Sequence, residues 1–148
     1  MKTIEKILLT IFIVIILISL GILVWYLFFH KQRDNYDTMK NILGKPLEKC
    51  TDNTGFYRDG FCRTGPSDTG RHVVCATMTD KFLNYTKNMG NDLITPNPPS
   101  FPGLKAGDKW CLCASRWDQA YEAGLAPPVS SSATSESALR YVDKDRLL

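Results

Sequence analysis

Hydrophobic and polar residues are distributed unevenly along this chain. An uncharged apolar run extends from Ile7 to Phe29, whereas the rest of the chain is polar and interrupted by Pro and Gly. At about 1.5 Å per residue the run forms a helix of roughly 34 Å, enough to cross a hydrocarbon core of about 30 Å. Trp25 and Tyr26 lie near its C-terminal end, where aromatic rings favour the membrane interface. We therefore expect a single-pass transmembrane helix, with the lipid bilayer as a partner.

The flanking sequence bears on how this helix is used. The alternative is a cleaved signal peptide. The apolar region of a signal peptide spans about 7–15 residues and is followed by a cleavage site of small residues. The run in this chain is longer and is not followed by such a site. Lys2 and Lys6 precede the run and Lys31 and Arg33 follow it, so the positive-inside rule leans slightly towards a cytosolic C-terminal domain. Glycosylation of Asn84, in an Asn-Tyr-Thr sequon, would indicate the opposite orientation.

The polar part of the chain predicts a stalk and one small globular domain. The residues from 30 to 41 contain neither Pro nor Gly, and Gly44 and Pro46 end this helical stretch. We expect a tail over 1–6, the transmembrane helix over 7–29, a stalk over 30–43 and a globular domain over 44–148. A chain of 148 residues excludes a large enzyme of several domains.

Within the domain, few strands alternate with short helices and long turns. This pattern lacks a βαβ rhythm and predicts a compact α+β fold. Thr79 is a suitable N-cap and Gly90 a suitable stop for one helix, and Thr134 could cap the last one. The expected elements are turns over 50–70, a strand over 71–78, a helix over 80–89, a loop over 91–102, a strand over 109–115, and helices over 117–123 and 134–141.

The charge balance argues against one class of partner. Eighteen basic residues nearly balance fifteen acidic ones, and no basic stripe with interleaved aromatic residues is present. We therefore expect no nucleic-acid binding.

Five cysteines are the main candidates for chemistry: Cys50, Cys62, Cys75, Cys111 and Cys113. Three interpretations stay open. The first is a set of disulfides, which would leave one of the five thiols unpaired. The second is a metal site formed by Cys75, Cys111, Cys113 and His72, although the Cys-x-Cys spacing is weak evidence for one. The third is that the cysteines are buried free thiols. Cys111 and Cys113 share one face of an extended strand, whereas His72 and Cys75 fall on opposite faces of a regular one.

No catalytic constellation is recognisable from the sequence. His30 lies at the membrane edge, so His72 is the sole candidate base, and a structural hydrogen-bonding role is favoured for it. Asp68, like Asp59, Asp92 and Asp108, lies in a turn sequence, which explains it without catalysis. The glycine-rich stretch around these residues lacks the lysine of a phosphate-binding loop. We expect no cofactor and no enzymatic activity.

Long contiguous motifs in the polar part of the chain carry a family resemblance. They are NILGKPLEKC (41–50), TGFYRDGFCRTGPSDTGRHVVCATMT (54–79), GNDLITP (90–96), FPGLKAGDKWCLCASRW (101–117) and EAGLAPPV (122–129). The segment 41–142 resembles a family of small, mostly bacterial proteins designated domain of unknown function 2237. The resemblance implies a cytoplasmic, soluble setting with reduced thiols, and no established activity. The membrane helix and the Ser-rich stretch after Val129 depart from the family pattern.

These observations together predict a membrane-anchored structural or interaction protein. Anchoring raises the local concentration of the domain, so modest contacts suffice for docking. Single-pass proteins of this kind tie the shell of large icosahedral viruses to an internal bilayer, so a minor capsid protein contacting other capsid proteins is the expected example. Phe101, Trp110, Trp117 and Tyr121 are candidates for core or contact. The alternative is a membrane-tethered enzyme that depends on a thiol or a metal.

Overall fold

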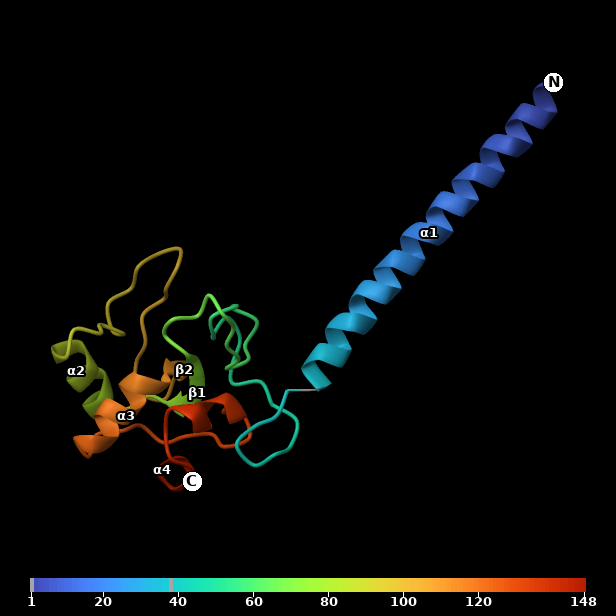
Figure 1. Cartoon of the computed structure of the whole chain (residues 1–148). Coiled ribbons are helices and arrows are strands. Elements are labelled where there is room, and N and C mark those ends of the chain that lie inside the picture. The colour runs from blue at the N-terminus through green and yellow to red at the C-terminus, as the bar shows by residue number, and fades with distance from the viewer. Residues whose placement is uncertain (1, 38) are drawn as a thin grey trace. The chain divides into compact units, whose positions relative to one another are not determined.

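The computed structural model describes residues 2–37 and 39–148, which belong to two separate units on either side of residue 38. The first unit is helix α1 (Thr3–Asp37), drawn in blue in Figure 1. Its segment Thr3–Lys31 contains a stretch of 18 residues with a mean hydropathy of 3.3 and none of them buried, so the helix is long and apolar enough to cross a membrane. The predicted anchor side chains, from Ile7 to Trp25, Tyr26 and Phe29, are all exposed.

The second unit is a small α+β domain, as predicted, built on two antiparallel strands. Strand β1 (His72–Thr77) pairs with β2 (Lys109–Cys113), with Cys75 opposite Cys111 and His72 opposite Cys113. The register shifts between His72 and Val74, where three residues of β1 face two of β2. Such a bulge turns the end of a strand and redirects its side chains.

Short helices surround this strand pair (Figure 1). They are α2 (Asp80–Asn88), α3 (Ala114–Glu122), the 3₁₀ helix η1 (Glu136–Arg140) and α4 (Lys144–Leu147). The prediction for α2 is confirmed: the Thr79 hydroxyl accepts a hydrogen bond from the Phe82 N–H at 3.2 Å. The second strand is shorter than predicted, because α3 begins immediately after Cys113.

The prediction that Thr134 caps the last helix is wrong. Ser135 takes this position, and its hydroxyl accepts from the Ser137 N–H at 3.2 Å. Thr134 is instead fully buried, and its hydroxyl accepts from the Cys75 N–H at 3.0 Å. A buried hydroxyl needs a partner within the protein, and the edge of β1 supplies one.

The main core lies between the strand pair and helices α2 and α3. Val73 and Val74 from β1, Leu112 from β2 and Phe82 from α2 are all at most 2% exposed. Of the aromatic residues singled out from the sequence, Trp110 and Trp117 are buried and Phe101 packs against the core, whereas Tyr121 is 42% exposed.

Residues 39–43, which the sequence assigns to the stalk, lie in the domain. Ile42 is 2% exposed within the main core, and its N–H donates to the Thr134 carbonyl at 3.0 Å. The Asn41 side-chain amide donates to the carbonyls of Pro46 and Ser132, both at 3.0 Å. These bonds join the start of the domain to its C-terminal third.

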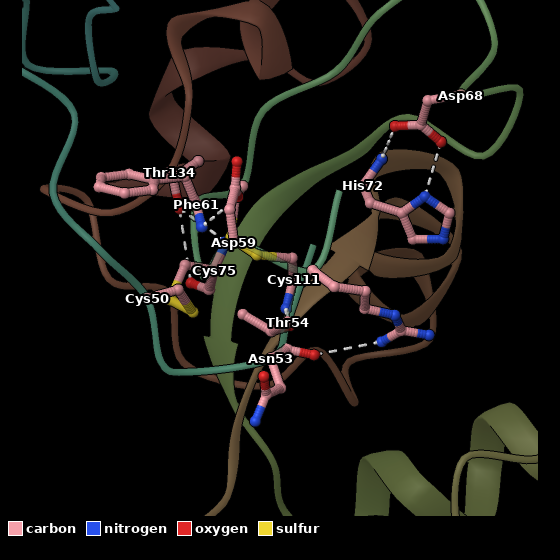
Figure 2. The surroundings of a disulfide bond; sticks show 12 residues. Cys50, Asn53, Thr54, Asp59, Phe61, Asp68, His72, Cys75, Cys111 and Thr134 are labelled. Carbon is pink, nitrogen blue, oxygen red and sulfur yellow. Dashed lines mark hydrogen bonds and ion pairs between the residues drawn. A yellow bond between two sulfur atoms is a disulfide. The ribbon is translucent and has the colours of Figure 1, made fainter. Parts of the chain in front are cut away.

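Two disulfides form a second core. Cys50 is bonded to Cys75 and Cys62 to Cys111, so both strands are tied to the long turn segment before β1 (Figure 2). The reduced cysteines that the family resemblance implies are therefore not the state in this structure. Cys62, Cys75 and Cys111 are fully buried and Cys50 is 6% exposed. Of the five cysteines, all in the described part of the chain, Cys113 alone has a free thiol.

We predict that the disulfides contribute strongly to stability, because the turn-rich segment has few regular backbone hydrogen bonds. Their cysteines are 25 and 49 residues apart. Replacing Cys50 and Cys75 by Ser should lower the free energy of unfolding by about 3.5 kcal/mol, and replacing Cys62 and Cys111 by about 4 kcal/mol. Denaturant unfolding of the full chain in detergent measures this loss. Cys113→Ser is the control, and an equal loss in that variant would contradict the prediction.

Candidate functional site

The free thiol lies where β2 passes directly into α3. Cys113 ends the strand and occupies the N-cap position of the helix, with φ −58° and ψ 131°. The Ala114 N–H donates to the Arg71 carbonyl at 3.0 Å, which fixes this junction against the beginning of β1. The amino end of a helix favours negative charge, and Cys113 is half-buried rather than enclosed. The Cys113 sulfur therefore lies at a helix end and is partly accessible to solvent.

His72 lies beside this thiol because of the bulge in β1. A regular strand would place His72 and Cys75 on opposite faces. The extra residue between His72 and Val74 shifts the register, so that His72 lies opposite Cys113. His72 Nε2 is then 3.4 Å from Cys113 Sγ, which is hydrogen-bond distance for sulfur. The bulge thus creates a Cys-His pair that the sequence pattern alone does not contain.

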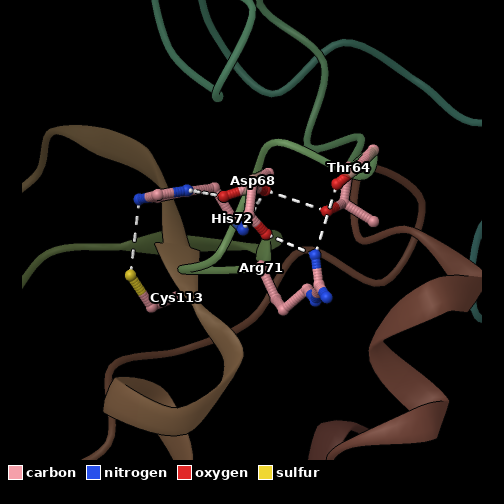
Figure 3. Close-up of polar contacts among 6 residues, drawn as sticks. Thr64, Asp68, Arg71, His72 and Cys113 are labelled. Atoms are coloured by element: carbon pink, nitrogen blue, oxygen red, sulfur yellow. Dashed lines mark hydrogen bonds and ion pairs between the residues drawn. The ribbon is translucent and has the colours of Figure 1, made fainter.

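Asp68 binds the other nitrogen of the same ring. Its Oδ1 is 2.6 Å from His72 Nδ1, while Oδ2 accepts from the His72 backbone N–H at 2.8 Å and from the Thr64 hydroxyl at 2.9 Å. Figure 3 shows the imidazole lying between the thiol and this carboxylate. Asp68 is fully buried, so its orientation is fixed by these bonds. Cys113, His72 and Asp68 form a continuous hydrogen-bonded array, which we call the triad.

The charges in the triad support one another. The pKa of His72 is raised to about 9, chiefly because its ring N–H can donate to the Cys113 sulfur; burial opposes the rise, and the Asp68 carboxylate contributes further to it. Burial disfavours the charged form of Asp68, but its bonds from the His72 N–H, the His72 ring and Thr64 outweigh this and hold its pKa below the usual value. The array therefore favours an imidazolium beside the Cys113 sulfur and a carboxylate on the other side of the ring.

Arg71 and Gly70 position the triad. The Arg71 guanidinium donates to the carbonyls of Gly65 and Asp68, at 3.2 and 2.5 Å, and so braces the turn that carries Asp68 (Figure 3). Arg71 also has a left-handed backbone, with φ 52°. A Cβ atom at Gly70 would lie 2.6 Å from His72 Cε1 and 3.1 Å from Cys113 Sγ. Only glycine leaves room for the ring and the sulfur to meet there.

Two cavities lie on either side of the triad. The smaller, about 250 Å³, is lined by His72 together with Phe56, Arg58 and Trp110. The Phe56 ring stacks on the His72 ring with centroids 6.3 Å apart, and Arg58 lies 5.1 Å from the centre of the Trp110 ring. The larger, about 690 Å³, is lined by Gly70 and Ala114 next to the thiol. A small molecule can therefore approach the His72 ring from the solvent side.

No metal site is predicted from the sequence, and its weak candidate ligands, Cys75, Cys111, Cys113 and His72, are not brought together as one group in the structure. Cys75 and Cys111 are in the two disulfides, whereas Cys113 and His72 pair with each other and with Asp68. The bulge separates the two sets because it shifts the register after the first residue of β1.

The sequence contains no recognisable catalytic constellation and explains Asp68 by its turn, whereas the structure also brings the Asp68 carboxylate to the His72 ring. Asp68 does form a turn, since its carbonyl accepts from the Arg71 N–H at 3.3 Å, but its carboxylate binds His72 as well. In the sequence, the spacing of four residues between Asp68 and His72 was the available indication of this contact. The spacing brings the two side chains together only because the chain turns between them.

The glycosylation candidate Asn84 lies inside α2. Its side-chain amide donates to the Asp80 carbonyl at 2.9 Å, and its side chain is exposed. The sequon residue Thr86 is buried, with its hydroxyl accepting from the Asn91 amide at 3.0 Å. In the folded domain the sequon is therefore part of a regular helix.

The domain is a small α+β fold built on a two-stranded sheet, with a Cys-His-Asp array at one end of the strand pair. Residues 40–148 match the model of the family described as "Uncharacterized protein conserved in bacteria (DUF2237)", so the chain belongs to this family. The resemblance seen in the sequence motifs is thereby confirmed. A search of curated proteins finds no match to the chain.

We predict that Cys113→Ser lowers the pKa of His72, because the bond from the sulfur contributes most to raising it. The wild-type ring should titrate near pH 9, and the variant ring at a lower pH, as measured by the NMR shifts of the imidazole. Since the folded-state pKa lies above the ordinary 6.5, protonated His72 stabilises the fold below about pH 6.5, and this contribution is lost as the pH rises through about 9.

The matched control for this titration is Asp108→Asn, which removes a carboxylate bonded to Lys105 instead of His72. It should leave the His72 titration unchanged. Identical titration curves for the wild-type protein and Cys113→Ser would contradict the assignment of the sulfur as the main cause.

We also predict that Gly70→Ala damages the triad. The new methyl group must displace the His72 ring or the Cys113 sulfur, at a cost of about 1–3 kcal/mol in unfolding free energy. The pKa of His72 should then fall towards 6.5, because the Cys113 bond lengthens. The same NMR titration measures this, and an unchanged His72 titration in the folded variant would refute the close approach.

Proposed function

We propose that this protein is a membrane-anchored enzyme that uses Cys113 as a covalent nucleophile in the transfer or hydrolysis of acyl groups. The observation that carries the proposal is the array of Cys113 Sγ, His72 and buried Asp68, with successive distances of 3.4 and 2.6 Å. A nucleophile, a base within hydrogen-bond reach and a third group that orients the base are the signature of nucleophilic catalysis.

Each residue of the triad has a distinct role in this chemistry. The proton of the Cys113 thiol passes to His72 Nε2 as the sulfur forms a bond to the acyl carbon, and the carbonyl π electrons move to the carbonyl oxygen. As the tetrahedral intermediate collapses, the leaving group departs with the proton held on His72 Nε2. Water then attacks the thioester, and His72 accepts its proton as the thiol is regenerated. Asp68 keeps the ring in the required orientation through Nδ1.

The surroundings of the thiol support this assignment. The partial positive charge at the amino end of α3, which has nine residues, favours the negative charge that develops on the sulfur and on the carbonyl oxygen. The cavity of about 250 Å³ beside His72 is large enough for a short acyl chain, with Trp110 and Phe56 as apolar walls. Arg58 supplies a positive charge for a polar group on the substrate.

Helix α1 supports the membrane part of the proposal, because a surface of exposed apolar side chains is stable in a bilayer and not in water. The orientation of the anchor stays a prediction. So does docking to capsid proteins inside a virus, for which the domain surface offers no specific observation.

The test is acylation of the full chain by p-nitrophenyl acetate. We expect a burst of one equivalent of p-nitrophenolate and acetylated Cys113 in a tryptic digest. Cys113→Ser should abolish the burst, and His72→Asn should slow it by about 10²-fold or more, because proton transfer by a positioned base contributes about that much.

The matched control is His30→Asn, which replaces the other histidine of the chain, in α1. It should leave the burst unchanged. A Cys113 that reacts no faster than the cysteine of a short unfolded peptide, at a rate unaffected by His72→Asn, would overturn the proposal.

A further inference from the structure

The four cysteines of the two disulfides lie in one compact cluster. The Sγ atoms of Cys50, Cys62 and Cys75 all lie within 4.8 Å of one another, and the fourth, Cys111, is bonded to Cys62. The two disulfides are therefore in contact rather than at separate points of the fold. Their buried neighbourhood contains the four cysteines and Ala133, with no buried charged side chain among them.

This cluster has the ligand set of a structural zinc site. Zn²⁺ binds four thiolates in a tetrahedron with Zn–S bonds of about 2.3 Å, which places the sulfurs about 3.8 Å apart. Bonded sulfurs would have to separate from about 2 Å to this distance, while the Cys62 sulfur is already within 4.8 Å of the Cys50 and Cys75 sulfurs of the other disulfide. Cys111 is bonded to Cys62 and lies opposite Cys75, so its sulfur belongs to the same cluster and has to rotate towards the other three.

The backbone holds the four residues in place independently of the S–S bonds. Cys75 and Cys111 face each other across β1 and β2. Their N–H groups donate to the buried hydroxyls of Thr134 and Thr54, at 3.0 and 2.9 Å (Figure 2). The Cys50 N–H donates to the Gly60 carbonyl at 2.9 Å, and the backbone of Cys62 pairs with that of Thr134 in an isolated β-bridge. Reduction therefore leaves four thiols in one buried cluster whose backbone positions are held by these contacts.

We propose that this cluster, when reduced, binds one Zn²⁺ ion through Cys50, Cys62, Cys75 and Cys111. A dithiol or phosphine reductant first supplies four electrons and is itself oxidised, and the two S–S bonds become four thiols. Zn²⁺ then displaces the four thiol protons to solvent and forms four Zn–S bonds. The metal replaces the disulfides as the link between the strand pair and the preceding turns, so the fold persists in a reducing compartment.

This site is distinct from the triad. Cys113 and His72 form the pair at one end of β1 and β2, whereas Cys75 and Cys111 of the cluster form a pair further along the strands. Cys113 and His72 bind each other rather than the cluster. The proposal does not depend on the proposed enzymatic activity, and the two can fail separately.

Native mass spectrometry of the full chain in detergent tests it. The protein is reduced with a phosphine and mixed with one equivalent of zinc chloride. We expect one Zn²⁺ per reduced chain and none on the oxidised chain. Cys75→Ser and Cys62→Ser should lose the metal, and the matched variant Cys113→Ser should retain it.

Because a ligand variant could fail to fold, the wild-type protein is also loaded with Co²⁺. Its absorption spectrum should show thiolate charge transfer and the intense visible bands of a tetrahedral site. N-ethylmaleimide should then label Cys113 in the zinc-loaded chain and spare the other four cysteines. A reduced wild-type chain that takes up no metal, or zinc that is lost in Cys113→Ser, would overturn the proposal.

Discussion

The antiparallel pairing of β1 with β2 is the constraint on which the rest of this domain depends. It brings together segments about forty residues apart in the chain and sets which side chains face each other. Cys75 opposite Cys111 directs two sulfurs into the second core, and His72 opposite Cys113 places a base beside a thiol. Between the two pairs lies the bulge, and without it His72 would face away from the sulfurs.

Two kinds of sulfur environment result, only two residues apart on β2. Cys111 is fully buried, is bonded to Cys62 and has its N–H bound by the Thr54 hydroxyl. Cys113 is half-buried, lies at the start of a helix and contacts an imidazole. The first environment encloses a cross-linked sulfur, whereas the second leaves a free thiol beside a base. A single short strand therefore supplies both a structural and a chemically reactive cysteine.

Local patterns in the sequence were sufficient for the elements but not for the site. The apolar run, the Thr79 cap and both strands follow from short-range rules, and the structure contains them. The partner of each cysteine depends instead on strand register and on the bulge, which arise from long-range packing. Asp68 illustrates the difference. The turn sequence predicts the backbone conformation around Asp68, but the contact of its carboxylate with the His72 ring depends on the left-handed backbone of Arg71.

The free thiol also bears on how the chain matures. A newly made chain with five cysteines can form several incorrect pairs, and correcting them requires a thiolate that attacks a disulfide sulfur. Cys113 lies on β2 close to Cys111, the disulfide partner of Cys62. An incorrect disulfide of Cys62 with Cys113 in place of Cys111 would therefore involve the same strand. In the folded domain the Cys113 sulfur contacts His72 while the other four sulfurs are buried, so exchange between the free thiol and either disulfide requires that the fold first open.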